Sequence, residues 1–309
     1  MGRAVRLGAD LEVGRLGLGA MQLCGPGAWG DPSDRPRALA VLRRAVELGI
    51  GLIDTADAYG PGSNERLIAE ALHPYPSGVV IATKGGQLRP APGEWRADGR
   101  PEHLRRACEA SLRRLRLERI DLYQLHAVDP RVPLEESVGT LARLREEGKI
   151  RHLGLCNVGA DQLRRARAVA PIAAVQRRYN LFDRVEPELL ALCEREAIPL
   201  ICWFPLANGE LGAGPGALRR IARSRGLSPA QVALAWLLSR SPVTLPIPGT
   251  GSLAHLEQNA RAMEVVLSEA EMAALERQRR PLEAELRRLA RGAARRGRGL
   301  ARRLRSRLA

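Results

Sequence analysis

The chain has few aromatic residues and almost no lysine. Phe, Trp and Tyr make up 3% of its 309 residues, and Lys84 and Lys149 are the lysines among 49 Lys and Arg residues. Lysine is a compact charge whose pKa shifts readily, a property that arginine does not share. Lys84 follows an apolar run, so we expect it to have a function; the alternative is that it remains by chance.

Cysteine motifs are also missing. The five cysteines form no Cys-x-x-Cys pair, their number is odd, and the five histidines do not stand at metal-ligand spacing from them. This pattern argues against a disulfide framework and a structural zinc site. We therefore expect free, mostly buried thiols and no metal.

Long apolar runs are absent as well. The best candidate, residues 232–238, is far too short for a membrane span, and residues 1–10 contain no apolar signal core. These absences favour a soluble, cytoplasmic protein with no membrane partner. The length fits one large domain or two ordinary ones and is ample for a buried core.

Positive charge is concentrated at the C-terminus. Residues 277–309 carry 13 Arg against two Glu, a net +11 out of +15, which leaves +4 for the rest. We expect residues 281–309 to form a basic low-complexity tail that is disordered or partly helical. It could bind a polyanion weakly through counterion release, but without aromatic residues it should not recognise nucleic acid specifically. A solvated extension is the alternative.

Short apolar runs alternate with helical patterns along the chain. The predicted strands are 16–20, 51–55, 79–84, 121–126, 150–157, 173–180, 199–205 and 244–248. The predicted helices are 35–48, 63–72, 101–115, 134–147, 160–169, 186–195, 216–225, 229–239, 253–262 and 268–280. Eight strand–helix units predict an α/β protein with a closed (β/α)8 TIM barrel, preceded by a β-hairpin over 5–13. An open doubly wound sheet is the alternative, but the Gly17-Leu18-Gly19 segment lacks its third glycine.

Four polar residues stand at or just after strand ends. Asp54, Lys84 and His126 end three predicted strands, and Tyr59 lies five residues after Asp54. Parallel barrels place their active sites at this rim. A phenol can give a proton to a carbonyl oxygen if a nearby ammonium lowers its pKa, and a carboxylate can hold that ammonium while an imidazole orients the oxygen. Each residue alone could equally be a cap or a packing residue.

The motifs around these positions resemble those of the aldo-keto reductase family. They are Ile-Asp-Thr-Ala-Asp-Ala-Tyr-Gly at 53–60, Ser-Asn-Glu at 63–65, Ala-Thr-Lys-Gly at 82–85, Asp-Leu-Tyr-Gln-Leu-His at 121–126, Gly-Leu-Cys-Asn-Val at 154–158, Val-Gln at 175–176, Tyr-Asn at 179–180, Trp-Phe-Pro-Leu at 203–206 and Ile-Pro-Gly-Thr at 247–250. The resemblance covers roughly residues 5–280. It implies a barrel domain over 1–280, NAD(P)H-dependent carbonyl reduction, and Asp54, Tyr59, Lys84 and His126 as the catalytic tetrad.

The resemblance also implies a set of cofactor-binding positions. Asn157 and Gln176 match residues that hold the nicotinamide carboxamide, and Trp203 matches the aromatic residue stacked on the ring, although it could simply fill the core. The full set is Gly19, Ala20, Met21, Asp54, Cys156, Asn157, Gln176, Trp203, Phe204, Pro205, Leu206, Gly209, Pro248, Gly249, Thr250, Gly251, Ser252, His255, Gln258 and Asn259. Cys156 stands where relatives often have serine.

The cofactor expected is NADPH, with NADH as the alternative. Gly251 and His255 stand where many relatives have arginine, so backbone N–H groups and hydroxyls at a helix N-terminus would have to bind the 2′-phosphate.

Met-Gln-Leu at 21–23, Gly-Pro-Gly at 25–27 and the 203–206 stretch are similar to those of a bacterial subgroup that acts on pyridoxal, giving pyridoxine. Trp29 and Trp95, with Tyr59 and His126, are the expected substrate residues; the two tryptophans could instead only pack loops. Small aldehydes and quinone-like carbonyls remain open as substrates. A cofactor-binding module that senses redox state on the same barrel is the competing function.

Overall fold

Eight parallel strands form the centre of the molecule. The computed structural model describes residues 4–212 and 216–278. The sheet runs in the order β3 (Leu18–Gly19), β4 (Leu52–Asp54), β5 (Val80–Gly85), β8 (Ile120–Leu125), β9 (Ile150–Cys156), β10 (Ala174–Arg178), β11 (Leu200–Trp203) and β12 (Thr244–Pro246). The Gly17 N–H donates to the Pro246 carbonyl at 3.0 Å, which brings the first and last strands together. The predicted barrel is therefore confirmed.

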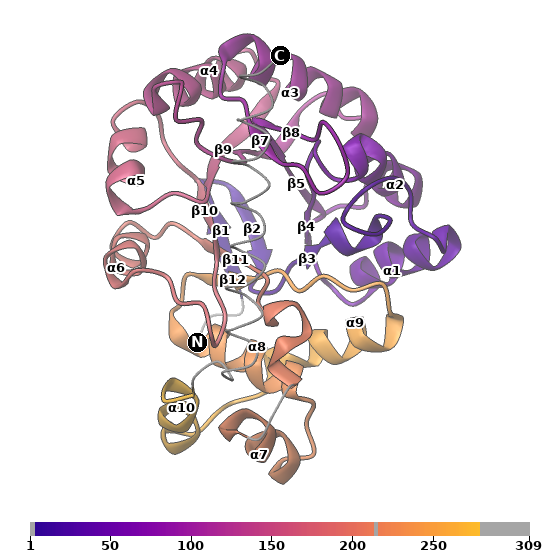
Figure 1. Ribbon diagram of the computed structural model, residues 1–309, viewed down its shortest axis with the longest axis vertical. Helices are drawn as coiled ribbons and strands as arrows, with labels where there is room; N and C mark the ends of the chain where they lie inside the picture. The colour runs from indigo at the N-terminus through magenta and orange to yellow at the C-terminus, as the bar shows by residue number, and fades with distance from the viewer. Residues whose placement is uncertain (1–3, 213–215, 279–309) are drawn as a thin grey trace, which may run out of the picture.

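Helices surround the strands on the outside (Figure 1). They are α1 (Arg35–Glu47), α2 (Ser63–Leu72), α3 (Pro101–Leu115), α4 (Leu134–Glu146), α5 (Ala160–Arg167), α6 (Pro187–Arg195), α7 (Ala217–Ser224), α8 (Pro229–Arg240), α9 (Leu253–Ala260) and α10 (Glu269–Glu276). Each overlaps a predicted helix. Pro101 and Pro229 occupy first-turn positions, where a missing N–H costs little. Gly49 and Gly148 follow α1 and α4 with φ of 78° and 76°, conformations that suit glycine.

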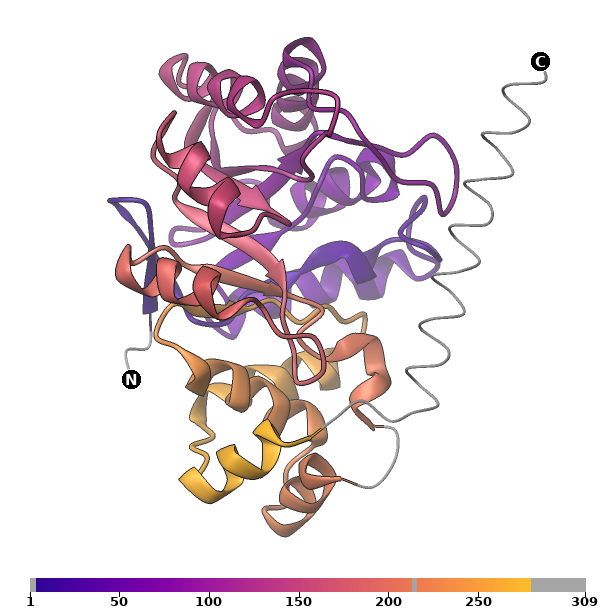
Figure 2. The same cartoon turned by 60° about the vertical axis from the view of Figure 1, so that its left-hand side comes forward.

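A β-hairpin closes one end of the barrel. It consists of β1 (Ala4–Leu7) and β2 (Leu11–Gly14), as predicted, and Figure 2 shows it in indigo at one end of the strands. Its buried side chains, Val5, Leu7, Leu11 and Val13, pack with Leu52, Val80, Leu122, Ile201 and Leu245 from the strands. The alternation of buried and exposed residues in β1 and β2 produces this apolar plug. The strands finish at the opposite end of the barrel, which is where parallel barrels place their active sites.

The loop after β5 contains a second hairpin that the sequence did not predict. β6 (Gln87–Leu88) pairs antiparallel with β7 (Arg96–Ala97). Short 3-10 helices, η1 (Ala20–Leu23), η2 (Gly60–Gly62), η3 (Ala207–Gly212) and η4 (Arg261–Glu264), complete the connections. β5 and β8 have the predicted length of six residues, and the other six strands of the sheet are shorter than predicted.

Three further predictions concern the C-terminal tail, the cysteines and membrane spans. Residues 281–309, the predicted basic tail, lie outside the described residues. The five cysteines are free thiols, four of them buried. Within residues 4–212 and 216–278, no helix is both long and apolar enough to span a membrane.

Candidate active site

A buried ion pair lies at the rim where β4 and β5 end. Lys84 Nζ is 2.6 Å from Asp54 Oδ2, and the two side chains are 0% and 2% exposed. Lys84 also donates to the Thr55 carbonyl at 2.8 Å. The parallel pairing of β4 with β5 places both residues on the same face of adjacent strands. An ion pair this deeply buried is stable only with its remaining hydrogen bonds satisfied, so its geometry is tightly fixed.

Tyr59 and His126 lie beside this pair. The Tyr59 ring centroid is 5.0 Å from Lys84 Nζ and 5.8 Å from the His126 ring, which it meets edge-on. Tyr59 comes from the loop after β4, and His126 directly follows β8, where its N–H donates to the Gly85 carbonyl at 2.8 Å. The structure thus brings together all four residues that the sequence singled out.

The electrostatics differ from the sequence-based expectation at Tyr59. Burial raises the pKa of the phenol to about 12, although Lys84 acts to lower it, and Asp54 raises it again. Burial alone would lower the pKa of Lys84, but Asp54 and the phenol raise it above its ordinary value. Lys84 therefore lowers the Tyr59 pKa as expected, but without offsetting the cost of burying the phenolate.

His126 is held as a neutral imidazole. Burial, followed by the charges of Lys84 and Arg89, holds its pKa well below the usual value. Nδ1 is buried and has no hydrogen-bond partner among the residues that the structure describes. A neutral imidazole can still donate one hydrogen bond, which is the role expected of it beside a carbonyl oxygen.

Two glutamines fix the carboxylate of Asp54. Gln124 and Gln176 donate from Nε2 to Asp54 Oδ1 at 3.1 and 2.8 Å, while Oδ2 binds Lys84. Gln176 was expected only at the cofactor, and Gln124 was not singled out. Gln124 could have been identified from the sequence, because it stands two residues before His126 in one predicted strand and residues two apart lie on the same face.

A second buried polar network lies behind the rim. Glu65, fully buried on α2, accepts from Thr83 Oγ1 at 2.6 Å and pairs with Arg114 Nε at 2.6 Å. Neighbouring Asn64 accepts from Thr55 Oγ1 at 2.7 Å and donates to the Ala20 carbonyl at 2.9 Å. Sequence reasoning missed these supporting roles, which tie residues next to Lys84 and Asp54 to the helix outside.

Side chains expected at the nicotinamide gather on the neighbouring strands. Asn157, with φ of 64°, donates to the His126 carbonyl at 3.2 Å and accepts from Trp203 Nε1 at 3.2 Å. Cys156 Sγ is 3.2 Å from the Asn157 amide nitrogen. Trp203 meets Phe204 with ring centroids 4.9 Å apart. Asn157 thus links His126 to the half-buried Trp203 at the rim.

The remaining expected cofactor positions lie in the connections after β3, β11 and β12 and on α9. A Cβ on Gly19 would come within 2.8 Å of the Ile247 carbonyl, and one on Gly249 within 2.7 Å of the Gly19 carbonyl, so these backbones pack without side chains between them. Ser252 caps α9 by accepting from the His255 N–H at 3.4 Å. Ala20 and Met21 lie in η1. Pro205 and Leu206 precede η3, and Gly209 lies within η3. Pro248 and Thr250 lie in the loop after β12, and Gln258 and Asn259 lie on α9.

The two expected substrate tryptophans occupy different places. Trp95 has its ring centroid 6.4 Å from Tyr59 and 6.2 Å from His126, each edge-on, so it borders the tetrad. The Trp29 ring is 5.4 Å from the guanidinium carbon of Arg89, which also stacks on Trp95 at 3.8 Å. Arg89 was not singled out, because one arginine in an arginine-rich chain carries no signal.

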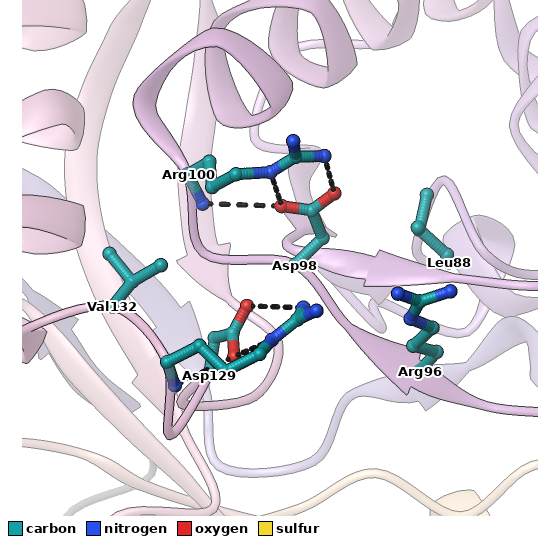
Figure 3. A pocket seen from close by; sticks show the side chains of 7 residues that line it. Leu88, Arg96, Asp98, Arg100, Asp129 and Val132 are labelled. Carbon is teal, nitrogen blue, oxygen red and sulfur yellow. Dashed lines mark hydrogen bonds and ion pairs between the residues drawn. The ribbon is translucent and has the colours of Figure 1, made fainter. Parts of the chain in front are cut away.

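A separate hollow lies close by on the β6–β7 hairpin. It is lined by Leu88, Arg96, Asp98, Arg100, Asp129, Arg131 and Val132 (Figure 3). Asp98 pairs with Arg100 at 2.6 Å and Asp129 with Arg131 at 2.8 Å, so its carboxylates are already bound within the chain. None of the tetrad lines it.

Comparisons with known proteins agree with this geometry. The model of the aldo/keto reductase family matches residues 15–280. An uncharacterised oxidoreductase of Schizosaccharomyces pombe is 43% identical over 87% of this chain and 88% of its own length. Pyridoxine 4-dehydrogenase of Escherichia coli is 40% identical over 86% of this chain and 94% of its own length.

Solved structures give the same result. An aldo-keto reductase from Klebsiella pneumoniae in complex with NADPH matches with a TM-score of 0.76 and 31% identity, covering 90% of this chain and 95% of that one. The glycerol dehydrogenase of Gluconobacter oxydans matches with a TM-score of 0.80 and 29% identity, covering 89% and 94%. The chain therefore belongs to the aldo/keto reductase family.

Proposed function

We propose that this protein reduces an aldehyde or ketone to the alcohol with NADPH, and that Tyr59 donates the proton. The observation that carries the proposal is the buried Lys84–Asp54 pair with Tyr59 5.0 Å away and His126 beside it. A phenol, a cation and a neutral imidazole at one rim can act together on a carbonyl oxygen. A domain comprising residues 1–280 would contain the whole machinery.

Each residue then has a task in proton transfer. His126 donates a hydrogen bond that orients the carbonyl oxygen, and Tyr59 passes its proton to that oxygen as negative charge develops. Lys84 favours the phenolate that remains, while Asp54, fixed by Gln124 and Gln176, holds Lys84 in place. A dinucleotide held by Asn157, Gln176 and Trp203 would supply the hydride for the carbonyl carbon.

The residues present fit a dinucleotide. Trp203 and the Asn157 amide lie at the rim next to the tetrad, and the backbones of Gly19 and Gly249 approach each other closely beside the Gln22 side chain. A Cβ on Gly251 would meet nothing within 4 Å, so the N-terminus of α9 is open for a phosphate. The Klebsiella relative binds NADPH, which supports NADPH over NADH.

Pyridoxal is the substrate that we propose first. The E. coli relative that is 40% identical is a pyridoxine 4-dehydrogenase, and Trp95 gives the rim an aromatic edge beside Tyr59 and His126. A flat heterocyclic aldehyde suits such a wall. Small aliphatic aldehydes and quinones are the comparison compounds.

The test is NADPH oxidation with a panel of aldehydes that includes pyridoxal, together with titration of each dinucleotide. We expect turnover of pyridoxal and tighter binding of NADPH than of NADH. Tight dinucleotide binding without turnover of any carbonyl would contradict the reductase function and favour a redox-sensing module. Turnover confined to other aldehydes would overturn only the substrate.

A further inference from the structure

A buried arginine joins the loops that carry the site. Arg89 follows β6 and is 8% exposed. Nη1 donates to the carbonyls of Ala28 and Ala58 at 3.1 and 3.3 Å, and Nη2 donates to the Gly27 carbonyl at 3.1 Å. Ala58 directly precedes Tyr59. The planar guanidinium therefore fastens the Tyr59 loop to the 27–30 turn.

The same guanidinium lies between two tryptophans. Its carbon is 3.8 Å from the Trp95 ring centroid and 5.4 Å from that of Trp29. Cation–π contacts of this kind partly replace the water that a buried arginine loses. Nε is buried without a hydrogen-bond partner within the described part of the chain, a cost that a purely structural side chain would be expected to avoid.

The charge of Arg89 is not balanced by a carboxylate. Its hydrogen-bond acceptors within residues 4–212 and 216–278 are backbone carbonyls, and it forms no ion pair there. Lys84, in contrast, is balanced by Asp54 at 2.6 Å. Burial lowers the pKa of Arg89, whereas the nearby Cys24 and Tyr59 side chains act to raise it, and arginine remains protonated.

The other groups facing Tyr59 add no net charge. Lys84 and Asp54 compensate each other. His126 is neutral, and burial raises the pKa of the Cys156 thiol to about 12, so it stays protonated. Cys24, which directly follows η1, is also a neutral thiol because burial raises its pKa to about 12. Among these groups, Arg89 is the cation that interacts with the phenol without a carboxylate partner of its own, and it donates to the carbonyl of the residue before Tyr59.

We propose that Arg89 is a positioning residue for the reaction: it supplies the net positive charge beside Tyr59 and fastens the loop on which Tyr59 lies. This inference rests on the proposed function. When Tyr59 gives up its proton, a phenolate forms in a buried site where the Lys84–Asp54 pair is already balanced. A fixed cation nearby lowers the free energy of that phenolate without having to move.

Two substitutions separate charge from geometry. Arg89→Met keeps an unbranched side chain but removes both the charge and the planar guanidinium with its hydrogen bonds. Arg89→Lys keeps the charge without the guanidinium. The measurement is the pH profile of kcat/KM for carbonyl reduction at saturating NADPH, which falls at high pH where Tyr59 has lost its proton. Because burial raises the pKa of Tyr59 to about 12, the profile is measured on protein that contains a more acidic fluorinated tyrosine. We expect Arg89→Met to lower kcat about 10-fold and to move this fall upward by about one pH unit. Arg89→Lys should restore the profile but only part of kcat.

Arg184→Met is the matched control. Arg184 stacks on Trp236 of α8 at 4.0 Å and pairs with Glu276 of α10 at 3.1 Å, so its contacts involve none of the tetrad and its loss should leave the pH profile unchanged. Circular dichroism and NADPH titration of each variant establish that the fold and cofactor binding persist. A folded Arg89→Met variant with the wild-type pH profile would overturn the proposal. So would a matching shift in Arg184→Met.

A second measurement does not require turnover. Replacing the four tyrosines with a fluorinated tyrosine makes the phenols more acidic, and 19F NMR then follows each titration, with Tyr59→Phe to assign the signal. We expect Tyr59 to titrate at higher pH in Arg89→Met than in the wild type. If Tyr59 titrates at the same pH in both proteins, Arg89 has no electrostatic role. If the titration shifts but the protein reduces no carbonyl, only the proposed function is contradicted.

Discussion

Gln176 donates from Nε2 to Asp54 Oδ1 at 2.8 Å, so a residue expected at the nicotinamide also holds the carboxylate of the buried Lys84–Asp54 pair. Under the proposed function, one side chain would therefore contact both the cofactor and the carboxylate that holds Lys84. Gln124, on β8, also donates to Asp54 Oδ1, at 3.1 Å. Unlike Gln176, it has no expected role at the cofactor.

This pair of glutamines gives the first prediction. Gln176→Leu should lower kcat and weaken NADPH binding, because both the Asp54 bond and the amide at the cofactor are lost. Gln124→Leu should lower kcat by a similar factor, about 10-fold, with an unchanged Kd for NADPH. Stopped-flow turnover and fluorescence titration measure the two quantities, and a Gln124 variant with weakened cofactor binding would contradict the division of roles.

Tyr59→Phe should remove only the acid. We expect kcat to fall by about 10²–10⁴-fold while the Kd for NADPH stays nearly unchanged, because the ring that packs against Trp95 and His126 is kept. Tyr179→Phe is the control: Tyr179 follows β10, but its phenol lies against Arg240 and Trp236 rather than beside Lys84 and His126. Retention of most of the rate in Tyr59→Phe would identify another proton donor.

Lys84→Arg should be damaging although it conserves charge. The ammonium is fully buried with donors to Asp54 and Thr55, and the larger planar guanidinium does not fit this space. We expect a loss of at least about 10-fold in kcat and lower thermal stability. Lys149→Arg, at a partly exposed surface pair with Glu109, should change neither. Full activity in Lys84→Arg would show that only the charge matters.

The neutral state of His126 predicts a pH dependence of stability. Its folded-state pKa lies below the unfolded value, so the unfolded state binds more protons as pH falls. Its contribution is fully present above about pH 6.5, the ordinary histidine value, and is lost as pH falls below it. Denaturant unfolding of wild type and His126→Asn should differ in slope there, by up to about 1.4 kcal/mol per pH unit. Parallel curves from pH 7 to pH 5 would contradict it.

Gly251→Arg tests the cofactor loop. The position is exposed, lacks a positive φ and has nothing within 4 Å of an added Cβ, so the substitution should be tolerated. A guanidinium there should tighten NADPH binding about 10-fold through its 2′-phosphate and leave NADH unchanged. Gly251→Gln provides the neutral control. Equal tightening of both dinucleotides would place the 2′-phosphate elsewhere.

The sequence predicted the barrel and the residues at its rim because apolar runs of strand length end in polar side chains. Asp54, Lys84 and His126 each interrupt such a run, so their convergence followed from the parallel arrangement. Residues inside a run, such as Gln124 and Thr83, looked like ordinary strand positions. Their roles depend on partners from other elements, which one segment of sequence does not specify.

Long-range packing also explains what sequence reasoning missed outside the strands. Arg89 and the β6–β7 hairpin lie in a Pro- and Gly-rich loop without periodicity, and their structure depends on contacts with residues 27–30 and 58. The pKa of Tyr59 moved opposite to expectation because its direction is decided by burial. Burial of a loop residue is a property of the assembled rim.

The scarcity of lysine has a practical consequence. Lys84 is fully enclosed, whereas Lys149 is partly exposed and lies just before β9, at the end of the strands opposite the tetrad. Reagents that acylate amines would therefore encounter one accessible lysine, besides the α-amino group of the chain. With the α-amino group blocked first, attachment to a solid support through Lys149 would hold the molecule in a uniform orientation, with the strand ends near Lys84 turned toward the medium.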